Sequence, residues 1–156
     1  MDSALARAIP VAQTLILPAS WRDYRAVRRL EKVCFGADAW PFPDVLGVLT
    51  LPNVVRLKAQ AGSEVLGFVA GDLRRADGLG WIATIAVLPD YQRQGLGERL
   101  LLECERQLNV PRIRLTVRLG NTPAIRMYEK WGYRRADRWP NYYTGGEDAL
   151  VLEKQL

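Results

Sequence analysis

The sequence predicts an α+β fold in which a mixed, mostly antiparallel sheet of six or seven strands carries helices on both faces. Strand-like and helix-like segments follow one another in the order β-α-α-β-β-β-α-β-α-β-β. The three consecutive strands in the middle are joined by short turns, which favours antiparallel pairing. A length of 156 residues is that of one domain, so we expect residues 1–156 to form a single domain.

The first third of the chain predicts one strand and two helices. Residues 14–17 are strand-like, and Ser20 followed by Asp23 is a helix-capping pattern. A second short helix passes through Leu49 and stops at Pro52. Apolar residues at helical spacing predict that the first of these helices is amphipathic. They are Trp21, Tyr24, Val27, Leu30 and Cys34.

The period of the sequence then changes to that of strands. Residues 54–60 and 65–73 predict two strands joined by a tight turn at Gly62. A second turn at Gly78 leads into a third strand over residues 81–87.

The next helix begins near residue 96 and has an apolar stripe that we expect in the core. The stripe consists of Leu96, Leu100, Cys104 and Leu108. Four charged residues of the same helix are expected to face water. They are Glu98, Arg99, Glu105 and Arg106.

The last third predicts three strands and one helix. After a strand over residues 113–117, Asn121 caps a helix that Gly132 terminates. Strands near residues 133–139 and 149–153 follow.

The composition is that of a globular protein without a membrane span. Hydrophobic residues make up 49% of the chain and charged residues 25%, and no apolar run approaches the length needed to cross a bilayer. The beginning of the chain does not fit a signal peptide, so we expect a cytoplasmic protein that does not associate with a membrane. A net charge of +5 favours anionic ligands such as phosphate groups or a nucleic acid. The arginines form no unbroken basic run, which argues against a nucleic-acid partner.

The chain contains no histidine and only two cysteines, Cys34 and Cys104. This composition provides neither the usual zinc-ligand clusters nor a histidine-dependent nucleophile, so we expect no metal site. The two cysteines are expected to be reduced residues of the core.

A glycine-rich turn connects the strand at residues 81–87 to the following helix. Gly95 and Gly97 leave room for main-chain N–H groups to approach a phosphate, and the first turn of a helix adds free donors and a positive dipole end. A pyrophosphate fits such a site. Glu98 stands where a Walker loop needs lysine, and no third glycine completes a dinucleotide fingerprint. A glycine turn without a ligand is the alternative.

Gln92, Gly95 and Gly97 resemble the Gln/Arg-x-x-Gly-x-Gly/Ala motif of the GNAT superfamily of N-acetyltransferases. The resemblance implies a GNAT-type sheet whose strands splay apart at a cofactor cleft, with acetyl-CoA as the cofactor and CoA as the product. It assigns the pyrophosphate to Gln92, Arg93, Gln94, Gly95, Leu96, Gly97 and Glu98. It assigns the pantetheine arm to Ile85, Ala86 and Val87, whose main chain would pair with the arm as a strand would.

A second segment resembles the later GNAT motif Asn-x-x-Ala-x-x-x-Tyr-x-x-x-Gly-Phe/Tyr. The matching residues are Asn121, Ala124, Tyr128, Gly132 and Tyr133. By resemblance, Asn121 and Tyr128 contact the cofactor, and Tyr128 is the catalytic residue that protonates the leaving CoA thiolate. A phenol held near the sulfur is chemically suited to this step. The alternative is that Tyr128 is only a core aromatic.

Three further stretches resemble the RimI-like branch, the bacterial N-terminal acetyltransferases of ribosomal protein. They are residues 31–41, residues 115–118 and residues 141–149. The resemblance implies that Glu31, Phe35, Trp40, Thr116, Tyr142 and Tyr143 bind the substrate. An ordinary aromatic pair in a hairpin is the alternative for the two tyrosines.

One position departs from that branch. Thr116 stands where a glutamate is taken as the general base, and a hydroxyl is a poor proton acceptor near neutral pH. The base is therefore unassigned, with Glu31 as a candidate unless its carboxylate is a solvated or capping charge. A peptide α-amine, with a pKa of ~8, needs less help from a base than a lysine with a pKa of ~10.4.

The predicted function is direct transfer of acetyl from acetyl-CoA to a primary amine, with a protein N-terminus, such as that of a ribosomal protein, as the favoured acceptor. The rivals are acetylation of a small amine (a polyamine, an amino acid or an aminoglycoside), a CoA-binding sensor without turnover, and nucleic-acid binding. The sequence is compatible with a monomer or a homodimer.

Overall fold

The computed structural model describes residues 10–156, which form a seven-stranded sheet with helices on both faces. The strands lie in the order β1-β2-β3-β4-β5-β7-β6, and every neighbouring pair except β4–β5 is antiparallel. The predicted fold class and order of elements are therefore confirmed.

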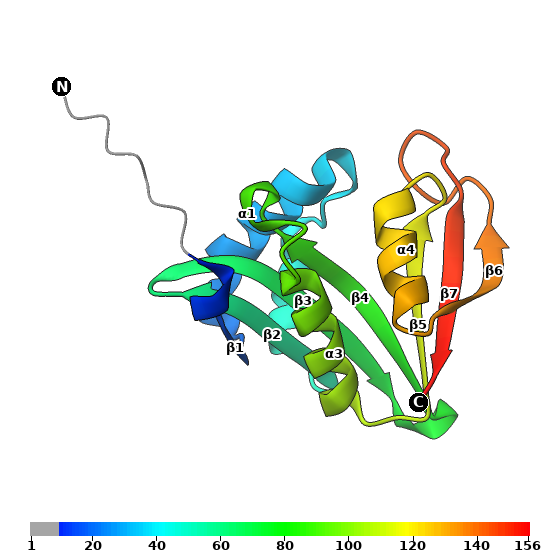
Figure 1. The fold of residues 1–156 in the computed structure, drawn as a ribbon, viewed down its shortest axis with the longest axis horizontal. Helices are drawn as coiled ribbons and strands as arrows, with labels where there is room; N and C mark the ends of the chain where they lie inside the picture. Colours follow the sequence, from blue (N-terminus) through cyan, green and yellow to red (C-terminus); the bar gives the residue numbers. More distant parts are fainter. Residues whose placement is uncertain (1–9) are drawn as a thin grey trace.

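The sheet consists of two groups of strands. The first group is β1 (Leu15–Pro18), β2 (Val54–Ala61), β3 (Glu64–Arg74) and β4 (Leu79–Val87). The second is β5 (Arg112–Arg118), β6 (Arg134–Trp139) and β7 (Ala149–Gln155). Figure 1 shows that the two groups separate toward one end and give the molecule the outline of a V.

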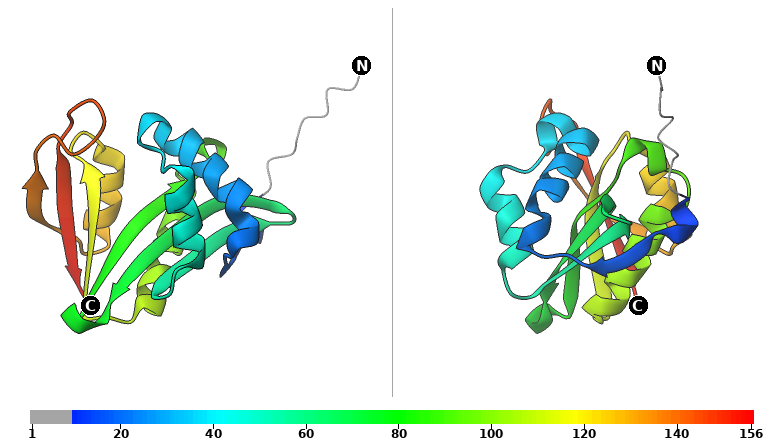
Figure 2. Two further views of the ribbon diagram at one scale, coloured as in Figure 1. Left: turned by 180° about the vertical axis from the view of Figure 1, so that it is seen from behind. Right: turned by 90° about the vertical axis from the view of Figure 1, so that its left-hand side faces the viewer.

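Four α-helices cover the two faces of this sheet. Helices α1 (Tyr24–Phe35) and α2 (Phe42–Thr50) pack on one face, and α3 (Leu96–Leu108) packs on the other, across β2, β3 and β4. Helix α4 (Thr122–Lys130) lies beside β5 on the same side as α3 (Figure 2). None of the helices in the described part of the chain is long and apolar enough to span a membrane.

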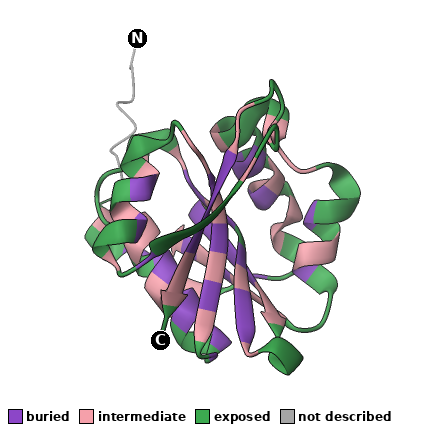
Figure 3. Ribbon diagram, turned by 90° about the vertical axis from the view of Figure 1, so that its right-hand side faces the viewer, coloured by how far each residue is buried: buried purple, intermediate pink, exposed green. Residues whose placement is uncertain are grey.

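The core follows the predicted apolar stripe of α3. Leu96, Leu100, Cys104 and Leu108 are all at most 1% exposed and pack against the strands. Gly71 allows this close approach, because a Cβ atom there would lie 2.9 Å from the Cys104 sulfur. Figure 3 shows buried residues along the central strands and on the inner sides of the helices.

Two local predictions are wrong. Glu105 was expected in water but is 5% exposed, because its carboxylate accepts hydrogen bonds from Tyr133 Oη (2.7 Å) and Lys154 Nζ (2.8 Å). Trp21 lies outside the apolar stripe of α1 and is 62% exposed. The capping box formed by Ser20 and Asp23 places Trp21 in a 3-10 turn before the helix, with Arg22 over its ring.

Candidate functional site

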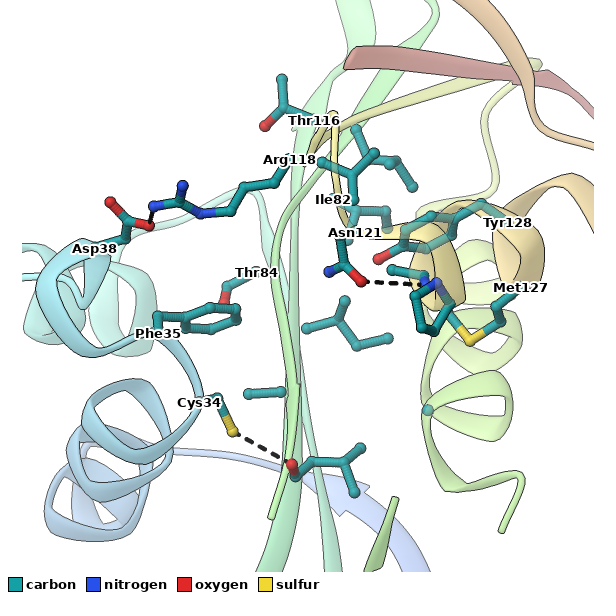
Figure 4. A pocket seen from close by; sticks show the side chains of 18 of the residues that line it. Cys34, Phe35, Asp38, Ile82, Thr84, Thr116, Arg118, Asn121, Met127 and Tyr128 are labelled. Carbon is teal, nitrogen blue, oxygen red and sulfur yellow. Dashed lines mark hydrogen bonds and ion pairs between the residues drawn. The ribbon is translucent and has the colours of Figure 1, made fainter. Parts of the chain in front are cut away.

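A cleft lies where the sheet divides. Strand β4 pairs with β5 only over residues 79–82, opposite residues 112–115. The register with β3 skips Ala83, and this bulge marks the point at which β4 turns away from β5. The resulting cleft has a volume of about 810 Å³ and is lined by both halves of the molecule (Figure 4).

The edge of β4 that faces the cleft presents free main-chain groups. Residues of an antiparallel strand alternate between bonding their partner and pointing away from it. Since Leu88 N–H donates to the Leu66 carbonyl, Val87 and Ile85 direct their N–H and C=O groups away from β3. The Val87 carbonyl accepts hydrogen bonds from Gln92 Nε2 (2.8 Å) and from the Cys34 thiol (3.2 Å). The other groups are open to an extended ligand, with no strand opposite them in the part of the chain that is described.

The glycine loop lies at the same end of the cleft. Two of its residues have positive φ, Arg93 (60°) and Gly95 (83°), and α3 begins directly after them. No side chain of residues 10–156 caps this helix, and its first main-chain bond runs from Arg99 N–H to the Gly95 carbonyl. The N–H groups of the first turn are thus free donors at the positive end of the helix dipole.

Two residues assigned to this loop do not line the cleft with their side chains. The Leu96 side chain is buried in the core and only 1% exposed, so Leu96 could contact a ligand only through its main chain. The Gln94 side chain turns back and donates to the Asp90 carbonyl at 3.3 Å. Gln92, Arg93, Gly95, Gly97 and Glu98 do line the cleft.

Helix α4 forms the opposite wall. Asn121 Oδ1 accepts a hydrogen bond from Ala124 N–H at 3.3 Å, which caps the helix beside the cleft (Figure 4). The Tyr128 ring is buried against Tyr133, with 5.7 Å between ring centroids, and Tyr128 lines the cleft. Burial, together with nearby Tyr143, raises the pKa of Tyr128. Its phenol therefore stays protonated near neutral pH and can donate a proton.

A salt bridge joins the two walls on this side. Lys130 of α4 lies 3.1 Å from Glu98 in the first turn of α3. Both side chains are partly exposed, so the pair contributes little to stability.

Helix α1 contributes a buried carboxylate to the other side of the cleft. Glu31 is 2% exposed and accepts hydrogen bonds from Thr84 Oγ1 (2.7 Å) and from Trp40 N–H (3.3 Å). Burial raises the pKa of Glu31, although both hydrogen bonds oppose the shift. Glu31 is therefore neither a solvated nor a helix-capping charge. A buried carboxyl with a raised pKa in a cleft is a candidate proton acceptor.

Cys34 lies three residues further along α1 and also lines the cleft. Burial and the nearby Glu31 raise the pKa of its thiol, so the thiol remains protonated and is a weak nucleophile. Both cysteines are free, as expected, but Cys34 is only half-buried in the cleft wall rather than in the core. Burial raises the pKa of Cys104 to about 12.

The remaining residues predicted to bind substrate also line the cleft. Phe35 and Trp40 come from the end of α1 and the following loop, and Thr116 comes from β5. Tyr142 and Tyr143 form an edge-to-face pair with ring centroids 5.0 Å apart. They are thus an aromatic pair and part of the cleft at the same time. Burial raises the pKa of Tyr143, while its hydrogen bond with the Thr116 hydroxyl acts in the opposite direction.

Several cleft residues were not among the predicted site residues. They are Cys34, Asp38, Ile82, Ala83, Thr84, Leu115, Val117, Arg118, Pro123, Ala124 and Met127. Asp38 and Arg118 form an ion pair although 80 positions separate them (Figure 4). Their opposite charges were the only signal in the sequence, and charge alone does not identify a partner.

Known proteins resemble this chain in sequence and in fold. Residues 24–133 match the model of the acetyltransferase (GNAT) family. An uncharacterised N-acetyltransferase of Methanocaldococcus jannaschii is 32% identical over 143 residues, which are 87% of this chain and 88% of that protein. The catalytic subunit NAA20 of the N-terminal acetyltransferase B complex of Arabidopsis thaliana is 36% identical over 67% of this chain, a match that spans 64% of its own length.

The fold is also that of a solved enzyme. The crystal structure of the ribosomal-protein-S18-alanine N-acetyltransferase from Escherichia coli aligns with a TM-score of 0.83 and 27% identity, covering 91% of this chain and 93% of that one. This likeness confirms the predicted resemblance to the RimI-like branch. The chain belongs to the GNAT family of acetyltransferases.

Proposed function

We propose that the protein transfers the acetyl group of acetyl-CoA to the α-amine of a protein N-terminus, by direct attack in a ternary complex. The observation that carries the proposal is the shared cleft. One side of the cleft has the free main-chain groups of β4, the uncapped N-terminus of α3 and the Tyr128 phenol. The other side has the buried carboxylate of Glu31 and the side chains of Tyr142 and Tyr143.

The cofactor would occupy the half of the cleft between α3 and α4. Its pyrophosphate would accept hydrogen bonds from the first-turn amides of α3, and its pantetheine would run along Ile85 and Val87. Tyr128 would protonate the CoA thiolate as the C–S bond to the acetyl group breaks and the amine takes up that group.

We assign the acceptor to the other half and the proton-accepting role to Glu31. An α-amine with a pKa of ~8 is mostly protonated at pH 7 and must lose a proton before it attacks. Glu31 faces the cleft and its raised pKa brings it closer to the working pH, which favours proton transfer through a water molecule. Because the Cys34 thiol stays protonated, we propose that the acetyl group passes directly to the amine and not through an acetyl-cysteine intermediate.

The carboxylates of the cleft argue against a small polycation as the acceptor. Asp38 is paired with Arg118 and Glu98 is paired with Lys130, which leaves Glu31 as the one cleft-lining carboxylate without an ion pair among residues 10–156. The cleft therefore offers little uncompensated negative charge to a polyamine or an aminoglycoside. Tyr142 and Tyr143 at its edge suit the main chain of a peptide.

The test is to incubate the protein with acetyl-CoA and three sets of acceptors: ribosomal proteins, short peptides with free N-termini, and small amines. Thiol release and mass spectrometry report transfer. We expect acetylation of free peptide N-termini and none of the same peptides blocked at the α-amine. Acetylated small amines without any modified α-amine would refute the peptide assignment, and CoA binding without thiol release in any set would support a sensor.

A further inference from the structure

Two loops flank the acceptor half of the cleft. One connects α1 to α2 and contains Asp38, and the other connects β6 to β7 and contains Thr144. Asp38 joins them: Oδ2 accepts a hydrogen bond from Arg118 Nη2, and Oδ1 accepts one from Thr144 N–H at 3.1 Å. We call these three residues the latch.

Arg118 is held firmly on its own side of the cleft. Its Nη1 donates to Glu147 Oε1 at 3.0 Å, its Nη2 reaches the Thr144 carbonyl at 3.4 Å, and its guanidinium lies 4.6 Å from the centre of the Tyr143 ring. Arg118 lowers the pKa of Asp38, so Asp38 is charged near neutral pH. The Asp38 side chain is only 16% exposed.

The latch joins the two halves of the molecule on the acceptor side of the cleft. Within residues 10–156, the two halves of the sheet pair only through the short β4–β5 ladder at the closed end of the V. The Glu98–Lys130 pair and the bonds of Glu105 to Tyr133 and Lys154 also join the halves, but they start from α3, on the other side of the sheet from Asp38. On the acceptor side, Asp38 connects the α1–α2 loop to the other half of the molecule by two bonds, one to the Arg118 side chain at the end of β5 and one to the Thr144 main chain in the β6–β7 loop.

We infer that Asp38 determines acceptor specificity: by tying the two loops together, the latch limits the width of the acceptor opening, so that a slender chain end reaches the cleft and a bulky one is excluded. This inference rests on the proposed function. Asp38 acts through the loops that it positions and does not take part in the acetyl transfer itself.

The test compares Asp38→Ala, which removes both bonds, with Asp38→Asn, which keeps an acceptor for the Thr144 amide. Asp44→Ala is the matched control, since Asp44 is an exposed carboxylate in α2 without an ion pair among residues 10–156. The acceptors are two peptides that differ only in the first residue, alanine or tryptophan. Hydrogen exchange at the Thr144 amide and CoA affinity are measured on each variant.

We expect the ratio of kcat/KM for the alanine peptide to that for the tryptophan peptide to fall about fivefold or more in Asp38→Ala, less in Asp38→Asn, and not in Asp44→Ala. Exchange at the Thr144 amide should be faster in Asp38→Ala, and CoA affinity should not change. A ratio within about twofold of the wild-type value despite faster exchange would overturn the inference, as would unchanged exchange.

Failure of the proposed function gives a different result. If the wild-type protein acetylates no peptide, the peptide assignment fails. The latch is then tested by the ratio of kcat/KM for ethylamine to that for tryptamine in the same variants, and the inference is overturned if neither amine is acetylated.

Discussion

The Tyr128 phenol is the proton donor in the proposed reaction. Its ring is buried and its pKa is raised, so the hydroxyl stays protonated until the thiolate forms. Replacing Tyr128 with Phe keeps the packing against Tyr133 and removes only the acid. We expect kcat to fall about 10²-fold or more, with CoA affinity nearly unchanged, in steady-state and calorimetric measurements. A variant with the wild-type kcat would remove Tyr128 from the mechanism.

Glu31 should determine how the rate responds to acid. A carboxyl whose pKa is raised above 4.5 is ionised only above that raised value, so its ability to accept a proton is lost as the pH falls through it. We expect an inflection in the pH profile of kcat/KM above pH 4.5 for the wild-type protein and no such inflection for Glu31→Gln. Glu31→Gln should also lose about 10²-fold in kcat/KM at neutral pH. An identical inflection in both proteins would show that another group titrates.

The first turn of α3 should carry much of the cofactor affinity. A Cβ atom at Gly97 would meet Met127 and Val87 only at 3.8 Å, so the helix accepts a side chain there. We expect Gly97→Ala to bind CoA nearly as well as the wild-type protein. In Gly97→Glu, the helix N-terminus tolerates the new carboxylate, but this carboxylate would compete with the pyrophosphate. We therefore expect Gly97→Glu to bind CoA about tenfold or more weakly than the wild-type protein. Equal affinities for CoA in calorimetry would place the pyrophosphate elsewhere.

Helix α3 is also tied to the back of the Tyr128 site by Glu105. This carboxylate is the acceptor for both the Tyr133 hydroxyl and Lys154, and all three groups are largely buried. Glu105→Ala would leave the Lys154 ammonium, on a side chain that is 16% exposed, without its ion pair and the buried Tyr133 hydroxyl without its acceptor. We expect it to lower the free energy of unfolding by about 3–5 kcal/mol, and Glu105→Gln to lower it by less.

Urea unfolding with an unchanged m-value measures this loss. Glu103 on the exposed side of the same helix pairs with Arg106 and is the control, for which we expect less than about 1 kcal/mol. If Glu105→Ala and Glu103→Ala lowered the free energy of unfolding by similar, small amounts, the buried network of Glu105 would contribute no more to stability than a surface ion pair.

Local patterns in the sequence were enough to predict the order of the elements and the glycine loop. Apolar periodicity, the Ser20 cap and the turns at Gly62 and Gly78 are local signals, and they predicted the order of the elements. The glycine loop was equally readable, since Gly95 adopts the positive φ that the turn requires. These features depend on residues close together in the chain.

The wrong and missing predictions concern residues that are distant in sequence. The burial of Glu105 depends on Tyr133 and Lys154, which come from the end of α4 and from β7. Asp38 meets Arg118 only because the whole sheet folds into a V. Spacing along one element carries no information about such contacts.

A crystal structure with a conjugate of CoA and a short peptide tests both halves of the cleft at once. We expect the pyrophosphate on the first-turn amides of α3, the pantetheine along Ile85 and Val87, and the peptide leaving past Tyr142 and Tyr143. A conjugate bound elsewhere, or a CoA moiety in the cleft with the peptide leaving on the α3–α4 side, would contradict it.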